Sequence, residues 1–112
     1  MANLVPLNTF KSNTATVTTT DLIAYQAPTG VTTVVLLAQF ANIGTGTGNV
    51  SANIYRSGAN TQIIKNFAVP EGDAASVLTG RLILEEGNRL YIRADENNKF
   101  KFVFSFLETA NA

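Results

Sequence analysis

The sequence has no cysteine, no histidine and no tryptophan, and it has few charged residues. Without cysteine the chain forms no disulfide and offers no thiol for catalysis. Histidine and cysteine are also the usual transition-metal ligands and the usual partners in nucleophile activation, so those common kinds of site are excluded. Charged residues make up 14% of the chain, and the formal net charge is zero. This balance argues against nucleic acid or an anionic membrane as a partner.

The acidic residues occur in pairs within turn-like segments. Catalytic carboxylates usually need a cleft that shifts their pKa, and residues 95–98 lack the ligand order of an EF-hand. The glycine-rich loop at 44–49 precedes a predicted strand, whereas a phosphate-binding loop needs a following helix. We therefore predict no catalytic residue, no metal, no cofactor and no small-molecule substrate, and we do not expect an enzyme. The acidic pairs are Glu71 with Asp73, Glu85 with Glu86, and Asp95 with Glu96.

At 112 residues the chain has the length of one domain. The longest uncharged apolar segment, Val31–Ile43, is too short to cross a bilayer. The first six residues, Met-Ala-Asn-Leu-Val-Pro, lack the basic region and apolar run of a secretory signal. We expect a soluble protein made in a cytoplasm, with no membrane partner.

Alternation of polarity between turn residues predicts an all-β chain. In the last predicted strand, Lys99–Leu107, phenylalanine recurs at every second position, so Phe100, Phe102, Phe104 and Phe106 share one face. Full burial of each ring is worth about 1.5–3 kcal/mol, so this face is predicted to be core or interface. In total, about seven or eight short strands predict an antiparallel β-sandwich or jelly-roll-like fold. The other strands are expected at 22–27, 31–43, 50–56, 61–69, 81–85 and 89–94.

Three of these segments carry finer predictions. The long uncharged strand at 31–43 is expected to be central and bent or bulged, and residues 74–78 to form a helical turn or an irregular crossover. The strands at 81–85 and 89–94 are expected to form a hairpin about Glu86–Asn88. In the second of these strands Arg89, Tyr91 and Arg93 share a face, with Arg81 expected across the hairpin. Nearby acidic residues would neutralise that face, so we interpret it as solvated or subunit-facing and not as a nucleic-acid site.

Residues 1–20 are predicted to be an extended arm that precedes a β-sandwich domain at 21–112. Pro6 excludes a helix interior. Residues 12–20 are almost entirely Ser, Thr, Asn and Ala, too polar to bury themselves. An arm laid across a neighbouring subunit is the favoured interpretation. Its expected anchors are Leu4, Val5, Leu7 and Phe10.

The order of turns and strands resembles a family of small β-sandwich proteins. The likeness begins at Tyr25–Val34 and continues through a neutral strand ending at Ala41–Asn42. It closes with Val-Pro-Glu-Gly at 69–72 and Gly-Arg-Leu-Ile-Leu-Glu-Glu-Gly-Asn at 80–88. These segments resemble structural proteins of tailed bacteriophages, particularly cyanophages, over residues 22–108. The resemblance implies a head decoration (cement) protein, or a tail or fibre component, without catalytic residues.

The leading hypothesis is therefore a virion structural protein, a capsid decoration protein that bridges capsid subunits. Its expected partners are the major capsid protein and copies of itself, with a trimer favoured. Its expected location is the surface of the virion head, after assembly in the bacterial host cytoplasm. A first alternative is a tail, baseplate or fibre component. A second is a carbohydrate-binding module that uses Tyr55, Tyr91 and the loop Gly44–Asn49.

Overall fold

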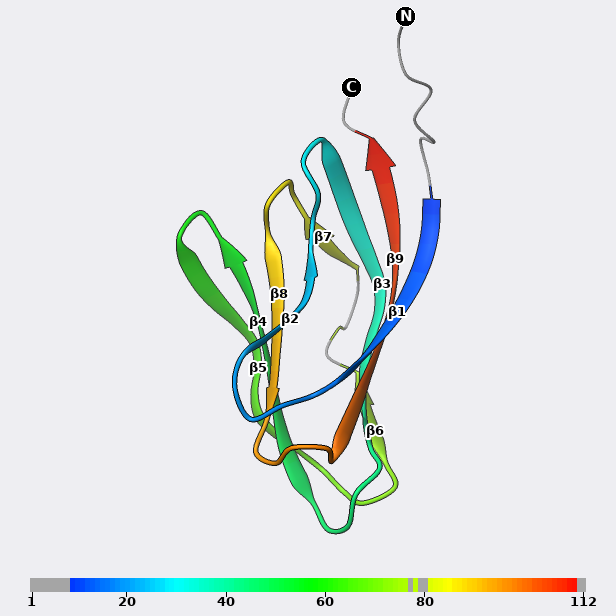
Figure 1. Ribbon diagram of the computed structural model, residues 1–112, viewed down its shortest axis with the longest axis vertical. Helices are drawn as coiled ribbons and strands as arrows, with labels where there is room; N and C mark the ends of the chain where they lie inside the picture. The colour runs from blue at the N-terminus through cyan, green and yellow to red at the C-terminus, as the bar shows by residue number, and fades with distance from the viewer. Residues whose placement is uncertain (1–8, 77, 79–80, 111–112) are drawn as a thin grey trace, which may run out of the picture.

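The computed structural model describes residues 9–76, 78 and 81–110. Over these residues the chain forms strands and turns without a helix. Two antiparallel sheets pack as a sandwich (Figure 1), which confirms the predicted fold class. The strands are β1 (Thr9–Thr16), β2 (Leu22–Gln26), β3 (Val31–Asn42), β4 (Gly48–Arg56), β5 (Ala59–Val69), β6 (Ala74–Ser76), β7 (Leu82–Leu84), β8 (Arg89–Ala94) and β9 (Phe100–Ala110).

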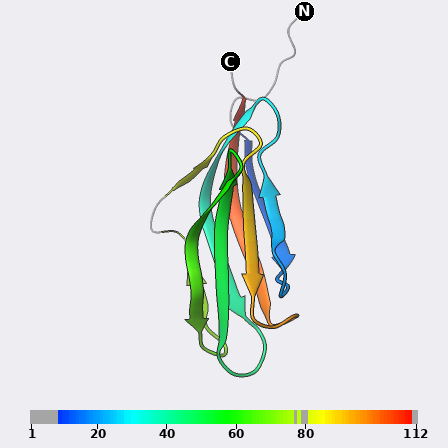
Figure 2. The same ribbon diagram turned by 90° about the vertical axis from the view of Figure 1, so that its left-hand side faces the viewer.

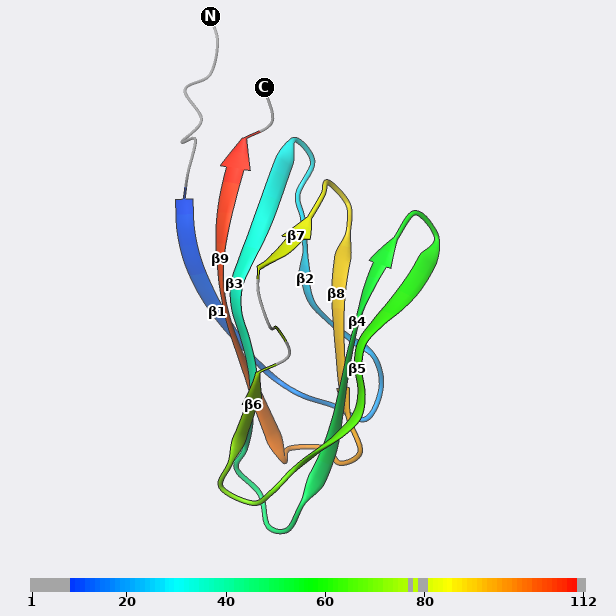
Figure 3. The same cartoon turned by 180° about the vertical axis from the view of Figure 1, so that it is seen from behind.

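The strand order is that of a jelly roll. The first sheet runs β1-β9-β3-β6, with β7 also paired to β3, and the second sheet runs β2-β8-β4-β5. The first strand thus pairs with the last, the second with the eighth, the third with the sixth and seventh, and the fourth with the fifth. The chain is a long hairpin rolled up on itself. Figure 2 views the sandwich from the side of β4 and β5, and Figure 3 shows β6 and β7 at two levels along β3.

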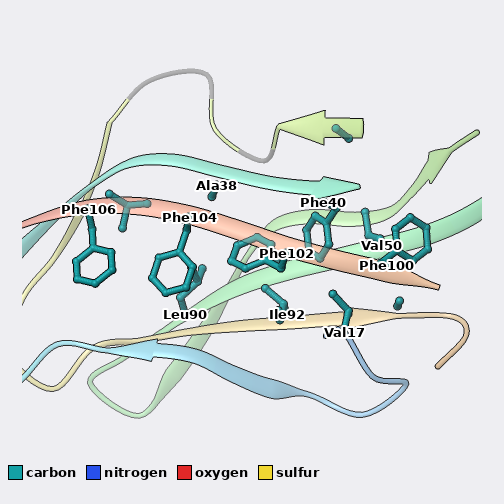
Figure 4. Close-up of a cluster of buried hydrophobic side chains, with 14 of the residues drawn as sticks. Val17, Ala38, Phe40, Val50, Leu90, Ile92, Phe100, Phe102, Phe104 and Phe106 are labelled. Carbon is teal, nitrogen blue, oxygen red and sulfur yellow. The ribbon is translucent and has the colours of Figure 1, made fainter. Parts of the chain in front are cut away.

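Aromatic rings from β9 fill the space between the sheets. The four phenylalanines at alternate positions of this strand are at most 4% exposed: Phe100, Phe102, Phe104 and Phe106. Leu90 and Ile92 face them from β8 (Figure 4), and both are fully buried. From β3, the ring of Phe40 lies 4.8 Å from that of Phe102, between centroids. The aromatic face predicted from the sequence therefore lies in the core of this sandwich.

A bulge in β3 sets which of its residues face the core. Its register with β9 shifts between Val35 and Leu37. Val35 and Ala38 are both fully buried although they are three residues apart, while Leu36 and Leu37 are 40% and 39% exposed. In a regular strand residues three apart point to opposite faces, so the extra residue is what keeps both halves of β3 on the core. The predicted bend or bulge in this strand is present.

The predicted hairpin of 81–85 with 89–94 is wrong. β7 pairs with β3 in the first sheet, whereas β8 pairs with β2 and β4 in the second. The turn between them passes from one layer to the other, and Gly87 N–H donates to the carbonyl of Ala27, 2.9 Å away. Arg81 therefore does not lie across a hairpin from Arg89. Turn residues specify that the chain reverses, but they do not specify the sheet that each flanking strand joins.

Two segments that were not predicted as strands join the first sheet. Ala74–Ser76, expected to be a helical turn or crossover, forms β6 against β3. Thr9–Thr16, within the expected arm, forms β1 and pairs with β9 from Thr9↔Glu108 to Thr16↔Lys101. Leu4, Val5 and Leu7 lie outside the described residues, so their role as anchors and the arm boundary at residue 20 stay predictions.

Candidate assembly interface

The solvent side of the first sheet carries a row of apolar side chains. Phe10 lies opposite Leu107, Leu107 opposite Val34, and Val34 opposite Ile83, so one row crosses β1, β9, β3 and β7. Directly opposed residues share a sheet face. Phe10 is 73% exposed and Ile83 is 45% exposed. We call this side of the sheet the outer face.

Further apolar residues extend the outer face along the strands. Leu36 and Leu37 at the bulge are exposed, and so is Val103 on β9. Among the described strand residues of this face, Lys101 is the ionised one, and its Nζ lies 2.7 Å from Oγ1 of Thr16. A shallow hollow beside the row is lined by Phe10, Lys11, Ser12, Leu36, Ser105 and Phe106. A largely uncharged, apolar sheet face with a hollow is typical of a protein-binding surface.

A polar contact between the sheets lies behind this face. The Tyr25 hydroxyl, from β2, donates to Oε2 of Glu108 on β9 at 2.5 Å and lies 2.8 Å from Oγ1 of Thr33 on β3. Lys11 Nζ, from β1, is 2.7 Å from Oε1 of the same carboxylate. The carboxylate and the tyrosine hydroxyl bound to it therefore link four strands of both layers.

Burial and charge set the titration of these groups. Burial acts to raise the pKa of Glu108, but the hydrogen bonds from Lys11 and Tyr25, with the Lys11 charge, hold that pKa below its ordinary value. Burial, together with the hydrogen bond to Glu108, raises the pKa of the Tyr25 phenol. Near neutral pH the pair is therefore a neutral donor on a charged acceptor.

The second sheet presents a different outer surface. Tyr55 and Tyr91 meet edge to face with their ring centroids 6.4 Å apart. The guanidinium of Arg89 lies 5.5 Å from the Tyr55 centroid, and its Nη1 donates to the Tyr91 hydroxyl at 3.0 Å. These contacts place the cation against aromatic groups of the same sheet, whereas its Nε is buried without a hydrogen-bond partner among the described residues. The predicted face shared by Arg89, Tyr91 and Arg93 is thus present, and Ile23 lies beside it, opposite Tyr91.

The residues expected for a sugar site come together only in part, because the two tyrosines meet but the loop at 44–49 lies apart from them. Tyr55 lies near the far end of β4, seven residues beyond Gly48, about 23 Å along a strand. The loop at 44–49 instead packs on the start of β9. A Cβ added to Gly48 would lie 2.7 Å from Cε2 of Phe100, and one added to Gly44 would lie 2.8 Å from Cγ of Lys99. These glycines are needed for close packing, and the loop forms no site with the tyrosines.

The described part of the chain contains no group of three or more acidic, histidine or cysteine side chains placed to hold a metal ion. In the same part, no helix has the length and apolarity to cross a membrane. The outer face of the first sheet, with its apolar row and hollow, is the candidate interface. Of its aligned row, sequence reasoning named only Phe10, as an arm anchor, because three pairings among four strands had to be known before the row could be seen.

Comparison with known proteins finds similarity in the fold and not in the sequence. No protein family matches the sequence, and no curated protein matches it. The fold matches a solved structure of Bacillus endospore appendages, which form disulfide-linked pili. The match has a TM-score of 0.60 and covers 99% of this chain and 100% of the other, at 15% sequence identity. At this identity the likeness establishes a shared fold over the whole of both chains.

The predicted relation to phage head proteins is wrong. A full-length structural match is to an endospore appendage protein and not to a capsid decoration protein. The same finding contradicts the predicted major capsid protein partner, the trimer on a head lattice and the virion location. That resemblance depended on turn residues and strand alternation, which β-sandwiches of unrelated function share because the backbone requires them.

Proposed function

We propose that this chain is the structural, non-enzymatic subunit of an extracellular fibre that forms by polymerisation of its own copies. The observation that carries the proposal is the fold likeness to endospore appendage pili, which extends over nearly the whole of both chains. The low charge of the sequence supports it, because a subunit that is covered by neighbours needs less charged surface.

The joints of this fibre differ from those of the matched pili in one chemical respect. Those appendages are disulfide-linked, whereas this sequence has no cysteine. Its subunits are therefore held by non-covalent contacts. The outer face of the first sheet supplies apolar surface for such contacts, and burial of the Phe10 ring alone contributes about 1.5–3 kcal/mol.

Purified protein should form filaments visible by negative-stain electron microscopy above a critical concentration, which sedimentation measures. Ile83→Asp places a charge in the outer face and should raise that concentration at least about tenfold, a change of about 1.4 kcal/mol. Ile23→Asp is the matched control, because Ile23 and Ile83 are both 45% exposed and lie on outer surfaces of opposite sheets. It should leave assembly nearly unchanged.

Thermal unfolding must first show that both variants remain folded. Protein that stays monomeric at every concentration would refute the proposed fibre. Equal effects of the two substitutions would leave the fibre but remove the outer face as its contact surface.

A further inference from the structure

Strand β1 contributes little to the core of its own molecule. Its residues on the core side of the sheet include Lys11 and Asn13, both exposed, and Ala15, which is partly buried. The phenylalanines of β9 are covered by the second sheet, and not by β1, which lies at the sheet edge (Figure 1). Val17, just after β1, is the first fully buried residue of the described chain. The remaining sandwich therefore keeps most of its core without β1.

The strand pairing of β1 and its polar contacts to other elements are made with one strand, β9. It pairs with β9 over eight residue pairs. Lys11 binds Glu108 at 2.7 Å, Thr16 binds Lys101 at 2.7 Å, and Val17 N–H donates to the Phe100 carbonyl at 3.0 Å. All three partners, Glu108, Lys101 and Phe100, belong to β9. The same set can form whether or not β1 and β9 belong to one molecule.

The chain after Val17 provides a hinge. Residues 18–21 cross from the first sheet to the second and belong to no strand. The Thr18 carbonyl accepts from Ala94 N–H at 2.9 Å, and Thr19 N–H donates to Asn97 Oδ1 at 3.0 Å. These bonds fix the crossover to the second sheet, so the segment Thr9–Val17 can turn away while the rest of the fold stays in place.

We propose that the segment Thr9–Val17 of one copy pairs with β9 of the next copy, as an exchanged strand. The inference rests on the proposed function and names the joint of the fibre. Each copy has one donor segment and one acceptor edge, so exchange that is not reciprocal makes an open chain of subunits. Val17 would enter the core site that the neighbour's own segment leaves empty.

A second copy is the occupant that this edge specifies. Lys11 against Glu108 and Val17 beside Phe100 fix the register of the segment. Exchange preserves each of these contacts, so the closed and exchanged forms differ little in free energy and high subunit concentration favours the exchanged form. A foreign peptide would have to supply the same charge and apolar residue at the same spacing.

Engineered cysteine pairs test the exchange without interference from native disulfides, since the sequence has no cysteine. Thr14 lies opposite Val103 across β1 and β9, and Gln39 lies opposite Val103 across β3 and β9. The test variant is Thr14→Cys with Val103→Cys, and the matched control is Gln39→Cys with Val103→Cys. Fibres of each, confirmed by electron microscopy, are oxidised and dissolved in detergent without reductant. We expect a ladder of covalent multimers from the test variant and monomers from the control.

Monomers from test-variant fibres would overturn the exchange while leaving the fibre intact. If the unsubstituted protein forms no fibres, the proposed function fails. In that case covalent dimers of the soluble test variant would still support exchange, and monomers would overturn it.

Charge reversal gives an independent measurement. Lys11→Glu and Glu108→Lys each oppose like charges and should each impair assembly alone. A mixture of the two should recover it, because each donor then meets an acceptor of opposite charge on the other variant. Contacts within one molecule cannot be repaired by mixing, so recovery would show that the two residues meet between molecules. Failure of the mixture to assemble, with both variants folded, would contradict exchange.

Discussion

Replacing Glu108 with glutamine tests the polar contact between the sheets. The carboxylate accepts from Tyr25 at 2.5 Å and from Lys11 at 2.7 Å, and its side chain is 14% exposed. Glutamine keeps the shape and one carbonyl acceptor but removes the charge, so it weakens both contacts. Hydrogen bonds to charged groups are worth about 1.5–3 kcal/mol. Because Lys11 is half-exposed, we expect a loss of about 2 kcal/mol in the free energy of unfolding.

Urea unfolding at neutral pH measures this loss. With a slope of about 1–3 kcal/mol per molar urea for a small domain, the midpoint should fall by about 1 M. Glu85→Gln is the control, because Glu85 is 67% exposed and lies 3.8 Å from Arg56. That substitution should change stability by less than about 0.5 kcal/mol. Equal midpoints for Glu108→Gln and the unsubstituted protein would refute the role assigned to this carboxylate.

The Glu108→Gln variant also shows how much of the pH dependence of stability comes from Glu108. Because the pKa of Glu108 is lower in the folded chain, the unfolded chain takes up the proton more readily as the solution becomes acidic. The stability that Glu108 contributes is therefore present above its unfolded pKa of about 4.3 and is lost as the pH falls through its lower folded value. Between roughly pH 5 and pH 3 the unsubstituted protein should lose stability more steeply than Glu108→Gln. Parallel curves would contradict this assignment.

Three other changes have defined expectations. Gly48→Ala should cost about 1–3 kcal/mol by overpacking against the Phe100 ring, whereas Gly58→Ala, with φ +81° and nothing within 4 Å of the added Cβ, should cost only about 1 kcal/mol of strain. Thermal unfolding ranks the two, and the reverse order would contradict the packing argument. Phe104→Ala removes a fully buried ring and should cost about 3–5 kcal/mol in urea unfolding; a loss under about 1 kcal/mol would show that the ring is not in the core. Burial raises the pKa of Tyr25, so ultraviolet titration should show one phenol ionising only above the ordinary value of about 10, and Tyr25→Phe should remove that step. If Tyr25→Phe instead removes a step that occurs at lower pH, the assignment of the raised pKa to Tyr25 is refuted.

Local patterns predict the strands whose side chains alternate. The phenylalanines of β9 and the alternation in β8 are visible within a few residues, and the observed Arg89–Ala94 strand has the predicted bounds. Strand β1 carries no comparable signal, because its residues are mostly polar on both faces. It is a strand because β9 offers an open edge of backbone donors and acceptors, and that edge exists only after the sandwich has formed.

The candidate interface depends on pairings that no short segment encodes. The apolar row from Phe10 to Ile83 requires the registers of β1, β9, β3 and β7 to be known together. The contact of Tyr25 with Glu108 joins residues 83 positions apart. Isolated surface apolar residues are ordinary, so Phe10 and Ile83 gain meaning only when the folded chain aligns them.

The bulge in β3 has a consequence for how this protein can vary. One additional residue shifts the inward and outward alternation of the strand. Odd-numbered residues face the core before the bulge, and even-numbered residues face it afterwards. Removing Leu36 would rotate one half, turning either Val35 or Phe40 out to solvent. The insertion also makes two neighbouring leucines, Leu36 and Leu37, point outward together. Substitutions at this pair can therefore retune how strongly the molecule adheres to others while the interior is left alone.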